Sequence, residues 1–455
     1  MKYQSQKVAL AYFYSAMALF AAQVTFGLVL GYIYVAPNFL SELLPFNIAR
    51  MVHTNALVVW LLLGFFGAAF YLIPEESETE LYSPKLAYLQ LALLMAGTTA
   101  AVITYLFDLF PGNVLLGKQG REFLEQPLWV KLGIIVAALM FLFNITMTVL
   151  KGRKTAITNV LLMGLWGIAL FFLFSLYNPA NLTVDKMYWW YVVHIWVEGV
   201  WELVMASILA FMMLKLTGVD REVVEKWLYV IVALALFTGL LGTGHHYYWI
   251  GTPGYWQWIG SIFSALEIAP FFAMVVFTFV MVWKGRREHP NKAALLWALG
   301  CSTLAFFGAG VWGFMHTLAA VNYYSHGTQI TAAHGHLAFF GAYVSLNLAI
   351  MSYALPHLRQ RDPYNQVLNM ISFWLMSGGM VFMTFTLTFA GALQTHLQRV
   401  NGEAFMDVQD QLGLFYWMRF GSGVVVVAGA LLFIYAMAFP RREVIGRNAQ
   451  PAPAE

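Results

Sequence analysis

The stretch Thr331-Ala-Ala-His334-Gly335-His336-Leu-Ala-Phe-Phe340 places two histidines, one residue apart, inside an apolar segment long enough to cross a bilayer. Ionisable residues at membrane depth are costly and rare, so they indicate a functional site. On a helix, residues two positions apart project about 200° from each other, to opposite sides. The two imidazoles therefore predict two separate metal centres, one on each flank of a single helix. This geometry suggests two haems side by side.

The composition identifies the class of protein. The chain has 455 residues, of which 60% are hydrophobic and 10% are charged, and its mean hydropathy is +0.68. Soluble domains carry about 25% charged residues, so we expect an all-α integral membrane protein in which residues 1–455 form one polytopic domain. The net charge of +3 gives no indication of nucleic-acid binding. Each crossing needs roughly 20 apolar residues, and twelve candidate spans lie near 9–35, 51–73, 86–107, 128–150, 156–176, 188–215, 227–249, 256–283, 293–319, 327–355, 367–391 and 411–438.

Basic residues predict the orientation of the chain. With both termini cytoplasmic, roughly 18 of the 25 lysines and arginines fall on the inner side, as the positive-inside rule requires. The single cysteine, Cys301, excludes internal disulfides and the C-x-x-C-H motif of a c-type haem. Any haem in this chain must therefore be held by histidine.

The same orientation sorts the histidines by depth. Spans that begin at the outer face carry histidines one to three turns below it, and the seventh span ends near that face with two more. Random placement would rarely bring so many ionisable side chains to one level of a membrane. We therefore expect a haem or metal cluster in the outer third of the membrane, made by His53, His194, His245, His246, His334 and His336.

One part of this layer has the donor set of an iron site. In His194-Ile-Trp-Val-Glu198 an imidazole and a carboxylate stand four residues apart, on one face of the sixth span. The pair His245-His246 adds two nitrogen donors at the end of a helix. Three histidines with one glutamate suit iron better than copper(I), which prefers softer ligands. The alternative for Glu198 is a buried, hydrogen-bonded structural acid, which its position one turn from His194 disfavours.

The three histidines that remain account for two haems. One haem would have two axial ligands and be closed, which suits electron transfer alone. The other would have one axial ligand and an open face that can bind a small gas. If that face points toward the iron site, the two metals enclose a pocket for diatomic molecules.

The segments Ile48-Ala-Arg-Met-Val-His53-Thr-Asn-Ala and Gly327-Thr-Gln-Ile-Thr-Ala-Ala-His334-Gly-His336 complete the pattern. In this order the ligands resemble those of the haem-copper oxidase superfamily. Within it, the whole chain resembles the large, haem b subunit of the cytochrome c-dependent bacterial nitric oxide reductases. The resemblance implies that His53 and His336 are the axial pair of low-spin haem b and that His334 is the axial ligand of high-spin haem b3. It implies that the ligands of the non-haem iron are His194, His245, His246 and Glu198.

Two departures separate the chain from oxygen-reducing oxidases. Many oxidases carry a cross-linked tyrosine four residues after the first histidine of the sixth span, where this chain has Glu198. In addition, the inner halves of the sixth and eighth spans are nearly all apolar. The polar residues that conduct protons from the inner side in the oxidases therefore have few equivalents in this chain. We therefore expect protons to arrive from the outer side.

Acidic residues mark the expected proton route. The outer loop contains Arg121-Glu122-Phe-Leu-Glu125. By resemblance, Glu122 is a ligand of a calcium ion that bridges to haem propionates, and Glu125 lies on the proton uptake route. Glu267, about three turns into the eighth span, is expected to deliver protons as a neutral acid, with a structural hydrogen-bonded acid as the alternative.

Two arginines are expected to pair with haem propionates, since guanidinium groups bind carboxylates well. They are Arg50, three residues before His53, and Arg121.

The resemblance implies that two nitric oxide molecules are reduced, with two electrons and two protons, to nitrous oxide and water. It implies haem b, haem b3, a non-haem iron and calcium as cofactors. Because the chain has no c-type haem motif, we expect a small membrane-anchored c-type cytochrome subunit as its partner. That subunit would pass electrons from a periplasmic donor to low-spin haem b. The expected location is the bacterial cytoplasmic membrane, with the active site toward the periplasm.

Three alternatives stay open. Quinol-fed nitric oxide reductases carry a long N-terminal extension, whereas the first span here begins near residue 9, which favours the cytochrome c-fed type. An oxygen-reducing oxidase would hold copper in place of the non-haem iron. A multi-span transporter with a histidine and glutamate proton relay would spread those residues through the membrane thickness rather than gather them in one layer.

Overall fold

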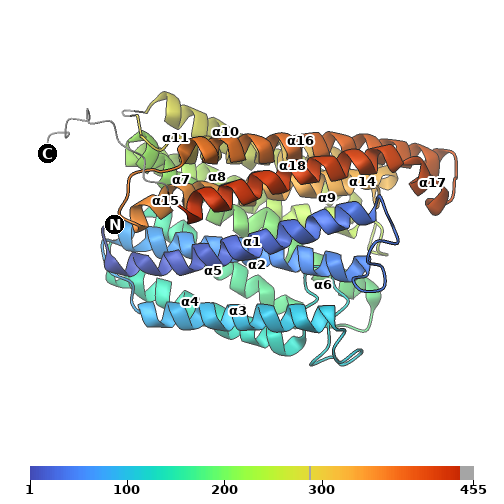
Figure 1. Cartoon of the computed structure of the whole chain (residues 1–455), viewed down its shortest axis with the longest axis horizontal. Coiled ribbons are helices and arrows are strands. Elements are labelled where there is room, and N and C mark those ends of the chain that lie inside the picture. The colour runs from blue at the N-terminus through green and yellow to red at the C-terminus, as the bar shows by residue number, and fades with distance from the viewer. Residues whose placement is uncertain (286–287, 441–455) are drawn as a thin grey trace.

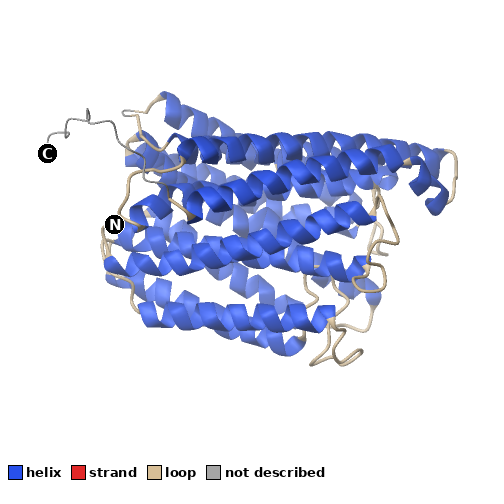
Figure 2. Ribbon diagram, viewed as in Figure 1, coloured by secondary structure: helices blue, strands red, loops and turns tan. Residues whose placement is uncertain are grey.

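The structure, a computed structural model of the chain, describes residues 1–285 and 288–440. Long helices lie side by side in one bundle, and no strand occurs in these two ranges (Figures 1 and 2). Within the same ranges, twelve helices are long and apolar enough to cross a membrane. The expected all-α membrane class is therefore confirmed. The N-terminus and the end of the last helix lie at the same end of the bundle, as an even number of crossings requires (Figure 1).

The first six crossings are α1 (Val8–Ile33), α2 (Phe46–Ser77), α3 (Pro84–Leu106), α4 (Leu128–Lys151), α5 (Ala156–Phe172), and the joined α6 (Leu182–Ile195), η3 (Trp196–Val200) and α7 (Trp201–Thr217). The next three are α8 (Arg221–Gly242) with η4 (Thr243–Tyr247), α9 (Tyr255–Leu266) with α10 (Ile268–Trp283), and α11 (Lys292–Ala305) with η5 (Phe306–Trp312) and α12 (Gly313–Thr317). The last three are α14 (Gln329–Phe339) with η6 (Phe340–Val344) and α15 (Ser345–Leu358), α16 (Gln366–Thr395) with η7 (His396–Val400), and α18 (Gly413–Ala438). Shorter helices are η1 (Gln4–Lys7), η2 (Leu173–Leu176), α13 (Ala319–Ser325) and α17 (Phe405–Gln411).

Local sequence explains where several of these helices begin. The first backbone N–H groups of a helix have no partner inside it, and short polar side chains satisfy them. The side chains of Ser83, Thr155, Asn181 and Asn291 each accept such a bond at the start of α3, α5, α6 and α11. Between their caps the segments are apolar, and a helix satisfies its own backbone polar groups in lipid.

Burial separates a central group of helices from a peripheral one. In the most apolar window of the α6–η3–α7 crossing 83% of the residues are buried, and the share is 89% for α14–η6–α15 and 78% for α2. By contrast, the share is 22% for α3. The three central crossings carry His53, His194 and the pair His334 and His336. The candidate ligands are therefore shielded from lipid by the helices around them.

Candidate metal centre

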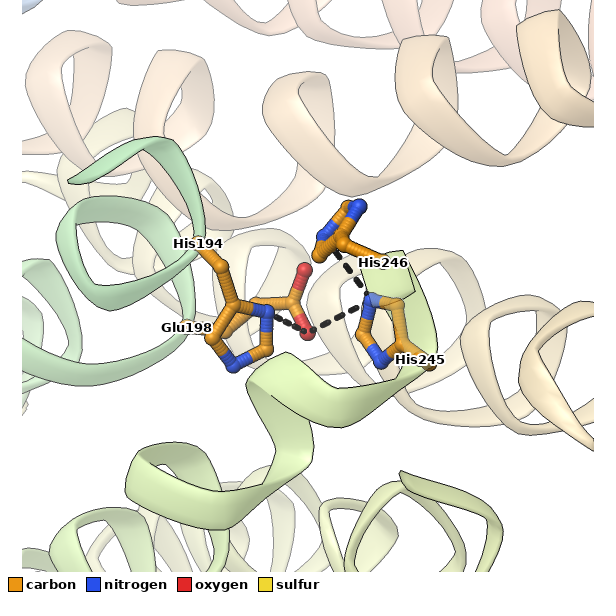
Figure 3. A group of neighbouring side chains, drawn as sticks. All are labelled: His194, Glu198, His245 and His246. Carbon is orange, nitrogen blue, oxygen red and sulfur yellow. Dashed lines mark hydrogen bonds and ion pairs between the residues drawn. The ribbon is translucent and has the colours of Figure 1, made fainter. Parts of the chain in front are cut away.

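Four side chains from two crossings converge in the core of the bundle. His194 lies at the end of α6, Glu198 in η3, and His245 and His246 in η4. One ligand atom from each of the four residues lies within 4.8 Å of the others. Figure 3 shows the Glu198 carboxylate between the rings of His194 and His245. This is the donor set expected from the sequence, brought together from segments about fifty residues apart.

The hydrogen bonds of two rings show which nitrogen faces the centre. His194 donates from Nε2 to the Gly239 carbonyl at 2.8 Å, which leaves Nδ1 facing Glu198 Oε2 at 3.5 Å. His245 contacts the Ser264 hydroxyl through Nδ1 at 2.8 Å, and its Nε2 lies 4.0 Å from Glu198 Oε2. Partners on the outward nitrogen fix both the tautomer and the orientation of a ligand histidine.

The third ring is held by stacking. His246 lies parallel to the indole of Trp190, with ring centroids 4.6 Å apart and planes 4° apart. Trp190 belongs to α6, one turn before His194. The Nε2 of His246 faces the Nε2 of His245 at 2.9 Å. The crossing that contains α6 therefore supplies two ligand candidates and also the surface on which a third one rests.

A π-helical turn, and not a regular helix, carries the carboxylate. Glu198 has φ −116° and ψ 26°, outside the helical range, within the turn Trp196–Val200. Such turns are uncommon and occur frequently at functional sites. The Tyr343 hydroxyl donates to the carbonyl of Val197, which precedes Glu198. The expectation of one continuous helical face through His194 and Glu198 thus needs refinement, because the local winding changes between them.

Polar atoms without partners indicate that this centre is built for an additional group. Among the described residues, His194 Nδ1, Glu202 Oε2 and Glu267 Oε1 are buried and make no hydrogen bond. Buried polar groups in native proteins are normally satisfied, so three such exceptions gathered beside a cluster of imidazoles and carboxylates favour a bound ion at this place. Two imidazole nitrogens at 2.9 Å beside a carboxylate are also the arrangement that a cation stabilises. The residues present therefore fit a metal ion with mixed nitrogen and oxygen ligands.

Two further carboxylates adjoin the four. Glu267 lies between α9 and α10, and its Oε1 is 3.6 Å from His194 Nε2. This places the acid expected from the sequence directly beside a ligand candidate. Glu202, on α7, is also buried. The sequence motifs did not point to Glu202, although it follows Glu198 at the i+4 spacing that places two side chains on one helix face.

The three histidines expected to bind haem share a pattern of hydrogen bonds. Each directs Nδ1 at a backbone carbonyl, which can only accept, so Nδ1 carries the proton and Nε2 keeps its lone pair. In addition, a Cβ at Gly335, between two of them, would meet no atom within 4 Å. The Nε2 lone pairs and the open space beside α14 fit axial ligation of a flat macrocycle. The Nε2 of His53 also lies 3.4 Å from Gln23 Nε2, an amide nitrogen that can donate to it. The carbonyl partners are Gln23 for His53 (2.9 Å), Gly308 for His334 (3.0 Å) and Ala332 for His336 (2.7 Å).

Glu125 lies in a buried polar cluster near the N-terminal end of α2. Its carboxylate accepts from Asn55 Nδ2 at 2.8 Å, and Asn55 stands two residues after His53. Burial raises the pKa of Glu125 to about 7, against the lowering effect of the Asn55 hydrogen bond. A carboxyl that titrates near neutrality can both take up and release protons.

The other residues of this loop form ion pairs. Arg50 pairs with Glu122, and about half of the Arg50 side chain is exposed. Arg121 is buried and pairs with Asp185, and it also donates to the carbonyls of Ser175 and Tyr177. The structure therefore brings Arg50 and Glu122 together, whereas the guanidinium of Arg121 already binds the start of α6 and the turn before it.

Known proteins similar to this chain fall in one family. Residues 7–425 match the family described as cytochrome c and quinol oxidase polypeptide I. The chain is 56% identical over 450 residues to a nitric oxide reductase subunit of Stutzerimonas stutzeri, an alignment that covers 96% of this chain and 95% of the relative. It is 25% identical to a cytochrome c oxidase subunit 1 homologue of Agrobacterium tumefaciens, covering 90% of this chain and 80% of the relative.

A solved structure has the same fold. The fold of a haem-copper terminal oxidase, seen by cryo-electron microscopy as a dimer, superposes with a TM-score of 0.73 at 14% identity. The match covers 95% of this chain and 83% of the oxidase chain.

Proposed function

We propose that this chain reduces nitric oxide. The chain belongs to the cytochrome c and quinol oxidase polypeptide I family, the haem-copper oxidases, and the proposal starts from this membership. Its 56% identity to the nitric oxide reductase subunit of Stutzerimonas stutzeri assigns it to the nitric oxide reductases of that family. The resemblance drawn from the histidine motifs is thereby confirmed. The proposed reaction converts two nitric oxide molecules, two electrons and two protons into nitrous oxide and water.

The family implies haem and metal cofactors, and we assign each ligand histidine to its metal through the ring nitrogen that does not bind a backbone carbonyl. His53 and His336 would hold a low-spin haem b through Nε2, and His334 would hold haem b3 in the same way. When bound, the low-spin haem would supply electrons, and haem b3 with a non-haem iron would bind and activate nitric oxide. The proposed ligands of the non-haem iron are His194, His245, His246 and Glu198.

The protein's own acids would supply the protons. Glu267 and Glu202 each keep a buried carboxyl oxygen without a partner beside the proposed iron site, so in their neutral forms both can donate a proton. Glu198 would bind metal and remain the nearest carboxylate to the reacting gas. Glu125, at the outer end of α2, would take up protons because its pKa of about 7 matches the surrounding pH.

We propose different roles for the residues of the outer loop. Glu122 would bind calcium, a cation that prefers carboxylate oxygens. In the structure Arg50 pairs with this carboxylate, and we propose that Arg50 would pair with a haem propionate when Glu122 holds calcium. Arg121, by contrast, would anchor the loop to Asp185 and to the carbonyls of Ser175 and Tyr177, which its guanidinium binds in the structure.

The location and the partner follow from the same reasoning. The twelve apolar helices make the chain a multi-pass membrane protein. We propose the cytoplasmic membrane of a bacterium, with both termini inside and the metal centre toward the periplasm. A small membrane-anchored c-type cytochrome subunit would deliver electrons, since this chain has no C-x-x-C-H motif of its own.

The observation that carries the proposal is a carboxylate, Glu198, within 4.8 Å of three imidazoles. The test is metal analysis of the purified chain with its partner, corrected for c-type haem, together with nitrous oxide measured after addition of nitric oxide. We expect about three irons in this chain, two from haem and one from the non-haem site, and no copper. One copper for every two haems, or a failure to produce nitrous oxide, would overturn the proposal.

A further inference from the structure

Helix α8 touches two of the proposed iron ligands through a single residue, Gly239. Its carbonyl accepts from His194 Nε2 at 2.8 Å. Its Cα hydrogens face the π-helical turn, where a Cβ would clash with the Glu198 carbonyl oxygen and lie 3.1 Å from its carbon. The same Cβ would lie 3.4 Å from the Cα of Gly199. A methyl group here would therefore push the turn that carries Glu198 away from α8.

One turn later, Gly242 makes the equivalent space for another acid. A Cβ at this position would overlap Glu267 Oε1 and lie 2.7 Å from the carboxyl carbon. Glu267 fills this space and keeps its Oε1 at 3.6 Å from His194 Nε2. A methyl group at Gly242 would therefore displace the end of the Glu267 side chain, and with it the Oε1 that faces His194.

Neither glycine is explained by local helix geometry. Both lie inside or at the end of α8, where glycine is intrinsically less favourable than alanine. Neither has the positive φ that makes glycine necessary in a turn. The remaining explanation for the two glycines is that other crossings approach α8 closely at these positions. The approaching groups are the backbone of Glu198 at Gly239 and the carboxyl of Glu267 at Gly242.

We propose that Gly239 and Gly242 are positioning residues of the metal centre. Gly239 would set the orientation of His194 and the place of the Glu198 turn, and Gly242 would hold Glu267 against His194. Outer partners of ligand histidines affect metal affinity strongly because they fix the ring and its tautomer. This inference rests on the proposed iron site and adds the residues that shape it.

The experiment compares Gly239→Ala and Gly242→Ala with a matched control, Gly378→Ala. Gly378 lies inside α16, and a Cβ there would meet no atom within 4 Å. Each variant is purified with its partner, and ferrous iron is titrated back after partial chelation. Low-spin haem absorbance reports folding, and the spectrum of the non-haem iron reports the site. We expect both variants to bind iron roughly 10-fold or more weakly, with intact low-spin haem, and the control to match the parent.

A double variant distinguishes a clash with Glu267 from a general disturbance of helix packing. Glu267→Ala empties the space beside Gly242, so adding Gly242→Ala to it should cause no further loss of iron affinity. Additive losses would overturn the role of Gly242. Parent-like iron affinity in both single variants, or loss of low-spin haem together with iron, would overturn the proposal as a whole. A parent protein without the third iron would instead refute the proposed function.

Discussion

Glu125 offers a quantitative test because its environment sets a measurable titration. Glu125 is 6% exposed, and burial raises the pKa of its carboxyl from 4.5 to about 7. Below pH 4.5 the group is protonated in both the folded and the unfolded chain. Between 4.5 and about 7 the unfolded chain loses this proton while the folded chain keeps it, so stability falls as pH rises. Above about 7 both forms are ionised and the loss is complete.

The magnitude follows from the same interval. A difference of one pH unit in pKa corresponds to about 1.4 kcal/mol, so the rise from 4.5 to about 7 amounts to about 3 kcal/mol. Glu125→Gln removes the titration and keeps the shape of the side chain. We therefore expect the glutamine variant to lack this part of the stability loss between about pH 5 and 8, and to be more stable than the parent at about pH 8 by about 3 kcal/mol.

The assay is an infrared titration of the carboxylic acid band, taken as the difference between parent and Glu125→Gln, together with thermal unfolding at each pH. Asn55→Leu provides an independent check. It removes the amide donor at 2.8 Å, and a hydrogen bond to a charged group is worth about 1.5–3 kcal/mol. The midpoint should then rise by about 1–2 pH units. A midpoint near 4.5 in the parent would refute the reasoning, because it would mean that water reaches the carboxyl.

The remaining predictions concern the ligands and the outer loop. His336→Ala should abolish the low-spin haem absorbance and leave non-haem iron in place; an unchanged spectrum would contradict the assignment. Glu198→Ala should abolish nitric oxide turnover and weaken iron binding roughly 10-fold or more while low-spin haem stays intact, and retained activity would remove Glu198 from the centre. Arg121→Ala should destabilise the protein by about 3–5 kcal/mol because Asp185 is left unpaired. The exposed pair of Arg153 and Glu78 is the control, and Arg153→Ala should cost at most about 1 kcal/mol in thermal unfolding.

The proposed ligands could be predicted from the sequence because each is recognisable within its own segment. The histidines and Glu198 are ionisable residues inside apolar spans, where any such residue is conspicuous. The positive-inside rule then assigned them to one level. Glu202 could have been found in the same way, since it stands four residues after Glu198 in an otherwise apolar segment.

The hydrogen-bond partners of those ligands could not be predicted from the sequence because they come from distant segments. Gly239 lies 45 residues after His194, and Ser264 lies 19 residues after His245. No spacing rule relates such residues. Asp185, the carboxylate that Arg121 pairs with in the structure, is likewise 64 residues away.

By itself, the sequence determined the membrane class, the twelve crossings and the identity of the proposed ligands. Apolar length and charge are properties of each segment alone, and the bilayer imposes them one helix at a time. Only the tertiary structure determined the orientation of the ligand side chains. The π-helical turn at Glu198, the carbonyl that orients His194 and the space opened at Gly242 depend on how closely α8 approaches two other crossings. That approach is a matter of packing between helices, which no single segment encodes.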